Sequence, residues 1–457
     1  MKKSVWMCLS LCVLAGQAAA LDLHGLRPDE IALWAAPVEN KGELLAHRAD
    51  APVNPASTMK LVTSWAALEI LRPTYRWTTR LVSDAPVVDG ALKGDLYWIG
   101  AGDPRFSEAD LSQLLRDLRL RGVRRIEGRL MLDKSVFGQL SNADGFEEDE
   151  GKTFTVGPDS HLTGLKVAWL RFFNDENGAR VVLDPPLPGI SVNSALRPSG
   201  NESCKDVRQW ASIRQEGDKV SISGVLPRAC DGARAYLNVL DHNSFANQSF
   251  SAWWQEQGGA GPQGFGVGTA PAGARELASH QSEPMTAALA DMNKYSNNTM
   301  ARTLFLTIGH EAGGDNPVAD AGKAVRQLLA SRQIDASALV LENGSGLSRR
   351  ERVTARMLGE VLRDAARGPY GGELIASLPI ASEDGTLKKR FAVWGPRIRM
   401  KTGTLKNVKA LAGYWQAADG RRLALVAIVN SPRALEMGAA LDAVVGDAIR
   451  QFDSSAQ

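Results

Sequence analysis

Hydrophobic and polar residues alternate with different periods along the chain, and these periods divide it into three parts. In the first part, apolar runs at residues 30–37 and 43–48 predict a β-hairpin. A longer apolar run from Leu61 to Leu71 predicts a buried helix that ends before Pro73. The first part is therefore expected to combine two strands with one helix.

The middle part, residues 77–274, has short strand-like runs separated by glycine, proline and aspartate. This spacing predicts one or two β-rich modules. One helix is expected within them, at Glu108–Arg121. The expected strands are Thr79–Ser83, Leu92–Ile99, Gly128–Leu132, Ala179–Leu183, Val220–Val225 and Ala235–Leu240.

Helical periodicity returns near residue 283, and strands follow near residue 398. The expected helices are Glu283–Asn293, Asn298–Gly309, Asn316–Arg332, Thr354–Ala366 and Arg433–Phe452, and the expected strands are Ile398–Leu405, Ala410–Gln416 and Arg422–Val429. The two ends together predict one α/β (α+β) domain with an antiparallel sheet. It would comprise residues 21–76 and 275–457, with residues 77–274 inserted as one or two β-rich modules.

The composition is that of an ordinary soluble globular protein, with 44% hydrophobic and 23% charged residues. The net charge of +2 comes from Lys2 and Lys3, because the other 51 basic residues are balanced by 51 acidic ones. This balance gives no indication of a nucleic-acid partner or of a surface for anionic membranes.

Residues 1–20 predict a cleaved secretory signal peptide. Lys2 and Lys3 precede an apolar segment from Val5 to Leu14, and Ala18 to Ala20 supply a small-residue cleavage site. A retained membrane anchor is the alternative, but the apolar segment is too short to span a bilayer. The mature protein is expected to be exported to the periplasm without an integral membrane segment. Peripheral membrane association and oligomeric state stay open.

Two cysteines, Cys204 and Cys230, remain after the predicted signal peptide. In an exported protein an even pair favours a disulfide, and two buried thiols are the alternative. The six histidines show no metal-binding spacing. We therefore expect neither a metal nor a cofactor.

The start of the predicted first helix can activate a serine. Asn54 suits the N-cap, Pro55 suits the first helical position, and Ser57 then falls at about the third. The Ser57 backbone N–H is one of the donors that a helix start leaves unpaired. Lys60 lies one turn further on the same face, within reach of the Ser57 hydroxyl. A nucleophile thus has both a base and a donor for an oxyanion beside it.

Two further short patterns follow in order, Ser296-Asn297-Asn298 and Lys401-Thr402-Gly403-Thr404. Each of the three patterns is weak alone, and a helix-start serine with a surface lysine would be the better interpretation of the first. Their conjunction is more specific, because one opens a buried helix, one lies between two helices and one lies on a strand.

This set resembles the penicillin-recognising serine acyl-transferases, which include serine β-lactamases and penicillin-binding proteins. The longer surroundings resemble the class C low-molecular-mass penicillin-binding proteins, which are D-alanyl-D-alanine carboxypeptidases and endopeptidases. The resemblance covers both ends of the chain and implies a transpeptidase-like antiparallel sheet covered by helices. Its segments are Asp291–Asn298, Gly344–Arg349, Asp384–Leu387 and Met400–Leu405.

Acyl-transfer chemistry and the resemblance together assign the roles. Ser57 is the nucleophile, Lys60 in its neutral form is its base, and Ser296 relays a proton to the leaving nitrogen. Asn298 would hold Lys60 and the substrate amide. The last pattern is expected to bind the terminal carboxylate through Lys401, Thr402 and Thr404, to let the substrate approach at Gly403, and to complete an oxyanion hole with the Thr404 N–H.

The sequence departs from the class C pattern in two places. Asn343 stands where the glycine-rich motif usually begins with aspartate, and the middle part lacks the tryptophan-rich form of that family. The family is thought to contact the amine of the substrate side chain through an acid in this part. Asp149 is the candidate for that contact, and a solvated acidic run is the alternative interpretation.

The sequence thus predicts a serine D-Ala-D-Ala carboxypeptidase and DD-endopeptidase that acts on peptidoglycan peptides and is acylated by β-lactams. A β-lactamase on the same fold is the first alternative, although no base for fast deacylation is visible. A non-catalytic peptidoglycan-binding protein is the second, and the intact Ser57, Lys60 and Lys401 argue against it.

Overall fold

A five-stranded antiparallel sheet built from both ends of the chain organises the fold, in the order β17-β18-β19-β1-β2. The computed structural model describes residues 22–40, 42–138, 140, 153–200 and 202–455; the predicted signal peptide and Asp149 lie outside them. The strands are β1 (Ile31–Pro37), β2 (Leu45–His47), β17 (Ile398–Leu405), β18 (Val408–Gln416) and β19 (Arg422–Asn430). The predicted hairpin and the three predicted C-terminal strands are therefore present.

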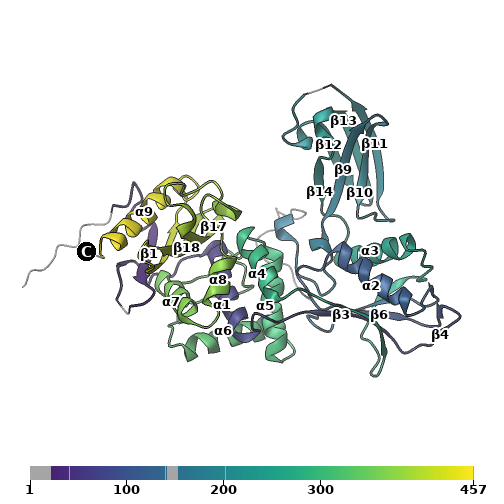
Figure 1. Cartoon of the computed structure of the whole chain (residues 1–457), viewed down its shortest axis with the longest axis horizontal. Helices are drawn as coiled ribbons and strands as arrows, with labels where there is room; N and C mark the ends of the chain where they lie inside the picture. Colours follow the sequence, from purple (N-terminus) through teal and green to yellow (C-terminus); the bar gives the residue numbers. More distant parts are fainter. Residues whose placement is uncertain (1–21, 41, 139, 141–152, 201, 456–457) are drawn as a thin grey trace, which may run out of the picture.

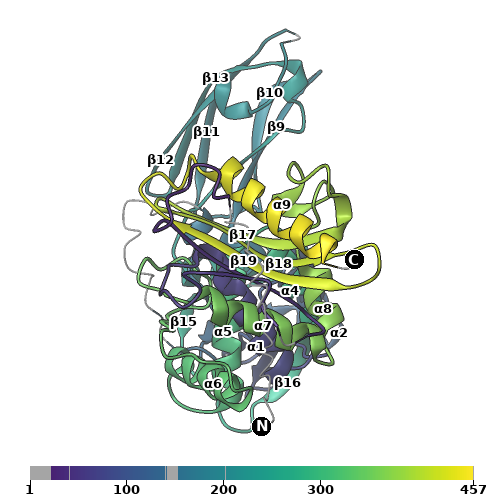
Figure 2. The ribbon, with the colours of Figure 1, turned by 90° about the vertical axis from the view of Figure 1, so that its left-hand side faces the viewer.

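Both faces of this sheet are buried, which explains why its strands are almost continuously apolar. In β1, Leu33 faces the layer that contains α9, whereas Trp34 faces the layer that contains α1 and α7. Figure 2 shows α9 on one side of the sheet and α1 and α7 on the other. The sheet is thus the rigid middle layer of a three-layer core.

Seven α-helices of the described residues belong to this part of the chain. They are α1 (Lys60–Ile70), α4 (Met285–Lys294), α5 (Asn298–Ala312), α6 (Pro317–Ser331), α7 (Ala355–Arg367), α8 (Gly371–Ser377) and α9 (Gly438–Ser454). Helix α8 was not predicted, because it is short and begins with two glycines, residues that disfavour a helix. The last helix begins at Gly438 rather than at the predicted Arg433.

The inserted region leaves and rejoins this core through two paired antiparallel strands, β3 (Thr78–Ser83) and β16 (Arg275–Gln281). They belong to a second five-stranded sheet in the order β15-β8-β6-β3-β16. Its other strands are β6 (Leu96–Ile99), β8 (Leu130–Asp133) and β15 (Phe265–Val267), and a small separate sheet is formed by β4 (Val87–Val88), β5 (Ala91–Leu92) and β7 (Arg125–Ile126). The predicted single strand at Leu92–Ile99 is therefore two short strands in different sheets.

Two helices, α2 (Glu108–Leu120) and α3 (His242–Glu256), pack on this second sheet around Trp98, Phe250 and Trp254. The prediction of a single helix in the middle part was wrong, because α3 is rich in asparagine, serine and aromatic residues with low helix propensity. An N-cap at Asp241, which accepts from the Ser244 N–H at 3.0 Å, and burial of one face stabilise it instead.

A second module of two three-stranded sheets stands on the first (Figure 1). Its strands are β9 (Ala168–Asp175), β10 (Gly178–Asp184), β11 (Ser191–Pro198), β12 (Ala211–Glu216), β13 (Lys219–Leu226) and β14 (Arg234–Leu237). A disulfide joins Cys204 and Cys230 beside its buried cluster. The domain prediction ended the insertion at residue 274, before β16; we instead propose residues 78–281 as the inserted region, because β16 pairs with β3.

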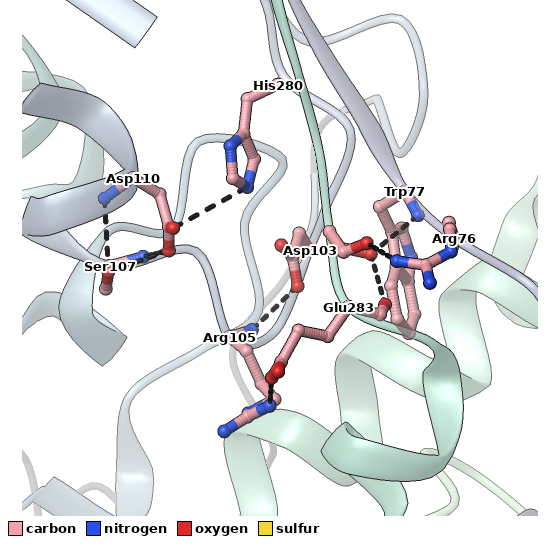
Figure 3. Close-up of polar contacts among 9 residues, drawn as sticks. Arg76, Trp77, Asp103, Arg105, Ser107, Asp110, His280 and Glu283 are labelled. Carbon is pink, nitrogen blue, oxygen red and sulfur yellow. Dashed lines mark hydrogen bonds and ion pairs between the residues drawn. The ribbon is translucent and has the colours of Figure 1, made fainter. Parts of the chain in front are cut away.

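Charged side chains join the inserted region to the core (Figure 3). Arg105 forms ion pairs with Glu283 and, at 2.9 Å, with Asp291 of α4. The Trp77 N–H donates to Ser282 Oγ at 3.0 Å, which ties together the entry and exit segments. Within the described residues, no helix is long and apolar enough to cross a membrane.

Asp103 makes this junction sensitive to pH. Burial raises the pKa of its carboxyl from 3.8 to about 6, so the folded chain binds this proton more tightly than the unfolded chain does. Its contribution to stability is therefore largest at low pH and is lost as the pH rises from about 4 to 6. A shift of about two units corresponds to roughly 3 kcal/mol.

Replacing Asp103 by Asn should remove this loss, because the amide oxygen can still accept from the Arg105 N–H. Relative to the unaltered protein, Asp103→Asn should become more stable as pH rises from 4 to 7, measured by denaturant unfolding at each pH. The exposed Asp84 supplies the control Asp84→Asn. A pH-independent difference for Asp103→Asn would contradict the expectation.

Candidate active site

The segment before α1 holds Ser57 in a 3₁₀ turn, Ala56–Met59, rather than at the third position of an α-helix as predicted. Pro55 stands before this turn, so its predicted place as first helical residue was wrong. The predicted N-cap at Asn54 was wrong as well, because Pro55 holds the N-cap position and no side chain caps the turn. Asn54 Oδ1 instead accepts from the Ala56 N–H at 2.8 Å. Its Nδ2 also donates to the carbonyls of Ser348 and Arg349, each at 3.1 Å. The Ser57 turn is thereby tied to the glycine-rich loop.

Lys60 is completely buried and directs its Nζ at three oxygens. Nζ lies 2.8 Å from Asn298 Oδ1, 2.5 Å from the Ser345 carbonyl oxygen and 3.0 Å from Ser57 Oγ. The first two oxygens can only accept hydrogen bonds, and a neutral amine has two N–H donors for them. The lone pair of neutral Lys60 is then left for the hydroxyl proton of Ser57. This is the geometry of a general base.

Burial also favours the neutral form of Lys60 and lowers its pKa to about 7, although the charge of Glu351 partly opposes this. The pKa of Lys401 is lowered as well, by its own burial and by repulsion from Lys60. Both side chains are inaccessible to solvent. Because two ammonium groups repel each other there, protonation of one lysine favours the neutral form of the other.

Ser296 lies in the turn between α4 and α5, and Asn298 is the first residue of α5. Ser296 has a left-handed φ of 59°, and its Oγ accepts from Lys401 Nζ at 2.8 Å. Asn298 opens α5, and its Nδ2 donates to the Phe154 carbonyl at 3.1 Å. This contact fixes the amide so that Oδ1 faces Lys60. The second sequence pattern thus contacts the lysines of the first and the third.

The third pattern lies on β17, the edge strand beside the Ser57 turn. A Cβ atom on Gly403 would lie 2.9 Å from the Pro55 carbonyl oxygen, so a side chain there would separate the strand from the turn. The Thr402 hydroxyl contacts Thr386 at 2.8 Å, and Thr404 accepts from Lys409 at 3.3 Å. An edge strand also offers backbone groups with which an extended peptide can pair.

The glycine-rich loop explains how Asn343 can replace the expected aspartate. Asn343 Oδ1 accepts from the backbone N–H of Ser345 at 3.0 Å and from its hydroxyl at 2.6 Å. An amide oxygen therefore suffices to shape the turn that presents the Ser345 carbonyl to Lys60. Gly346 has a φ of 78°, and a Cβ there would lie 1.8 Å from the Ala56 carbonyl oxygen.

Sequence reasoning missed two parts of this site. The Ser345 carbonyl contacts Lys60, and only the glycine-rich motif around it gave a signal. Glu351 is completely buried behind the same loop, but its sequence context, between Arg350 and Arg352, is typical of a surface. Asp149 lies outside the described residues, so its predicted contact stays a prediction. Among the described residues, no cluster of His, Cys, Asp and Glu could hold a metal ion.

The sequence of this chain is similar to those of known carboxypeptidases. The sequence model of the D-Ala-D-Ala carboxypeptidase 3 (S13) family matches residues 17–448. A D-alanyl-D-alanine carboxypeptidase of Actinomadura sp. (strain R39) is 30% identical over 390 residues, which cover 80% of this chain and 71% of that protein.

Two solved structures are similar over nearly the whole chain. Penicillin binding protein 4 (dacB) from Haemophilus influenzae has a TM-score of 0.75 at 23% identity, covering 93% of this chain and 96% of that one. It has also been solved in complex with a novel β-lactam. Bd3459, a predatory peptidoglycan endopeptidase from Bdellovibrio bacteriovorus, has a TM-score of 0.55 at 16% identity, covering 93% and 92%. These likenesses confirm the predicted fold class.

The protonation state of Lys60 should control the rate at which Ser57 reacts with a labelled penicillin. Because the Lys60 pKa is about 7, the neutral base and the acylation rate should increase as the pH rises through about 7. Second-order rate constants measured between about pH 5.5 and 9.5 test this. Lys60→Arg, whose guanidinium stays protonated, should be at least about 100-fold slower throughout. A rise centred near pH 10, the ordinary lysine range, would contradict it.

Gly346 should be needed for the position of the Ser345 carbonyl. In Gly346→Ala the Cβ would overlap the Ala56 carbonyl oxygen, so the loop must move away from Lys60. We expect acylation by penicillin to slow roughly 100-fold, the effect of about 1 Å of misplacement. Gly372→Ala is the matched control, because a Cβ there meets no atom within 4 Å. Equal rates for the two variants would show that the loop position does not matter.

Proposed function

The chain belongs to the D-Ala-D-Ala carboxypeptidase 3 (S13) family, and on this basis we propose that it is a serine peptidase which cleaves D-Ala-D-Ala bonds in peptidoglycan peptides through an acyl-enzyme on Ser57. The predicted relationship to the D-alanyl-D-alanine carboxypeptidases is thereby confirmed. The observation that carries the assignment to Ser57 is the 3.0 Å contact between its Oγ and the buried Lys60 Nζ.

Acylation begins when Ser57 Oγ attacks the carbonyl carbon of the penultimate D-alanine and its proton passes to neutral Lys60. The backbone N–H groups of Ser57 and Thr404 hold the negative charge that develops on the carbonyl oxygen. The C–N bond then breaks. The leaving nitrogen takes a proton from Ser296, and Ser296 takes one from Lys401, which contacts its Oγ. The proton that Lys60 received from Ser57 then passes to Lys401, so that Lys60 is neutral again for the next step. D-Alanine, or the acceptor peptide whose amine formed the cross-link, is released.

Water completes the cycle by attacking the ester carbonyl of the acyl-enzyme, with Lys60 again as the base. The C–O bond to Ser57 breaks, the serine regains its proton, and the shortened peptide leaves as a carboxylate. A β-lactam enters the same first step, because its strained amide presents a carbonyl to Ser57. Its leaving nitrogen stays tethered, however, and obstructs the water.

Several positive charges support binding of an anionic peptide. Protonated Lys401, with the Thr402 and Thr404 hydroxyls, supplies positive potential and donors for the terminal carboxylate. Beyond Leu405, a cavity of about 360 Å³ is lined by Arg349, Arg352 and Lys406. These cations suit a further carboxylate on the stem peptide. The predicted contact between Asp149 and a substrate amine remains part of the proposal.

The location follows from the substrate. Peptidoglycan lies outside the cytoplasmic membrane, so we place the protein in the periplasm after export through the predicted signal at residues 1–20. Its partners would be peptidoglycan stem peptides, their cross-links and β-lactams. The same acyl-enzyme serves carboxypeptidase and endopeptidase action, because the two differ only in what is attached to the leaving nitrogen.

Digestion of purified muropeptides tests this function. The protein should release D-alanine from uncross-linked pentapeptides and cleave cross-linked dimers, and labelled penicillin should form a stable adduct at Ser57. Ser57→Ala should lose both activities by at least about 1,000-fold, because it removes the nucleophile. Ser337→Ala, at an exposed serine, is the control and should behave as the unaltered protein.

Two other outcomes are informative. Rapid turnover of penicillin without muropeptide cleavage would indicate a β-lactamase on this fold. Peptidoglycan binding with neither adduct nor cleavage would indicate a non-catalytic binding protein. Full activity of Ser57→Ala would contradict the mechanism.

A further inference from the structure

Glu351 is a buried carboxylate that the mechanism above does not use. Its side chain is completely inaccessible to solvent. Its Oε1 accepts from the backbone N–H groups of Glu342 and Asn343, at 3.2 and 3.1 Å. Its Oε2 is buried with no hydrogen-bond partner in the part of the chain that the structure describes. A carboxylate in such a place is costly unless charge or structure nearby compensates for it.

The two hydrogen bonds of Glu351 hold the start of the loop that contacts Lys60. The Asn343 side chain, next in that loop, accepts from Ser345, and the Ser345 carbonyl accepts from Lys60 Nζ at 2.5 Å. Glu351 therefore binds the first residues of this turn, and Lys60 binds the Ser345 carbonyl further along it. A movement of the turn at Asn343 would displace the oxygen that orients the base.

Glu351 also acts on Lys60 through its charge. Burial raises the pKa of Glu351 to about 7, while the charge of Lys60 lowers it in part. In return, the Glu351 charge raises the Lys60 pKa and opposes its burial.

The other charged groups that face Glu351 come from three elements. Glu342 adjoins it in the loop and raises its pKa by repulsion, and Arg302 of α5 is attracted to it. Lys401 of β17 influences Glu351 only indirectly, because the charges of Lys401 and Lys60 repel each other. Arg352 donates to the Glu351 backbone carbonyl at 2.8 Å. Unlike these groups, Lys60 links Glu351 directly to catalysis, because its Nζ contacts Ser57 Oγ.

We propose that Glu351 is a positioning residue for acylation, which holds the glycine-rich loop against Lys60 and supplies a compensating negative charge to the buried lysines. The neutral Asn343 shapes the same turn without adding charge. A single aspartate at position 343 would both shape the turn and supply the negative charge. In this chain Asn343 shapes the turn and Glu351 supplies the charge. This inference rests on the proposed acylation of Ser57.

Charge and shape can be separated by mutation. Glu351→Gln removes the charge but keeps an oxygen for the two backbone N–H groups, so the Lys60 pKa should fall. The pH midpoint of penicillin acylation should then move down by about half to one unit. Glu351→Leu removes the hydrogen bonds as well, so its plateau rate should also fall, by at least about tenfold.

Adding charge should have the opposite effect. Asn343→Asp keeps the acceptor for Ser345 and places a carboxylate in the same turn, so the midpoint should move to higher pH. The double variant Asn343→Asp/Glu351→Gln should return it close to that of the unaltered protein. Because Asn343→Asp retains every hydrogen bond, it tests the proposal even if the Glu351 variants fail to fold.

Glu360→Gln is the matched control. Glu360 is a partly buried carboxyl on α7 whose pKa is also raised by burial, but it faces Arg356 and Arg363 rather than Lys60. Its variant should keep the midpoint of the unaltered protein.

An unmoved midpoint in both Glu351→Gln and Asn343→Asp would overturn the role of Glu351, as would an equal shift in Glu360→Gln. The proposed function fails in a different way. If the unaltered protein forms no adduct at Ser57, acylation itself is refuted. If it forms one with a Lys60-dependent pH profile and the charge variants leave that profile unchanged, only the inference about Glu351 is lost.

Discussion

Two lysines buried in one site are the constraint on which the rest of this structure depends. Removing an ammonium group from water costs several kcal/mol, and a second one nearby costs more because the two repel each other. The site meets this constraint by leaving Lys60 neutral at a pH near its lowered pKa of about 7 and by surrounding both lysines with oxygens. A group that is normally an acid thereby becomes a base.

The oxygens can do this only because they are held on rigid elements far apart in the sequence. The nucleophile stands in a turn that leads into α1, Asn298 opens α5, and Lys401 lies on β17 of the central sheet. Close backbone contacts at Gly346 and Gly403 fix the distances between these elements. The chemistry of these few side chains therefore depends on the packing of all three layers. Alternate residues of each central strand pack against the helices on the two sides of the sheet.

Short-range patterns were enough to predict the three motifs, the family and the fold class. The residues around each motif also predict the element on which it lies: a helix start, a turn between two helices and a strand. Features decided by long-range packing were not predictable in this way. The α3 helix forms from residues of low propensity because its face is buried, and the 3₁₀ turn at Ser57 reflects contacts of Asn54 with a distant loop. Glu351 looks like a surface residue between two arginines, and only the folded chain encloses it.

Strand β1 pairs with β19, from Ile31 opposite Val429 to Pro37 opposite Leu423. This pairing determines when the site can form during synthesis of the chain. A growing chain emerges from its N-terminal end, so β1 and Ser57 appear first and the inserted modules follow. Lys401 and the closing strand arrive only near the end of synthesis. The nascent chain therefore carries an inert serine, and reactivity begins only when the last strand joins the first.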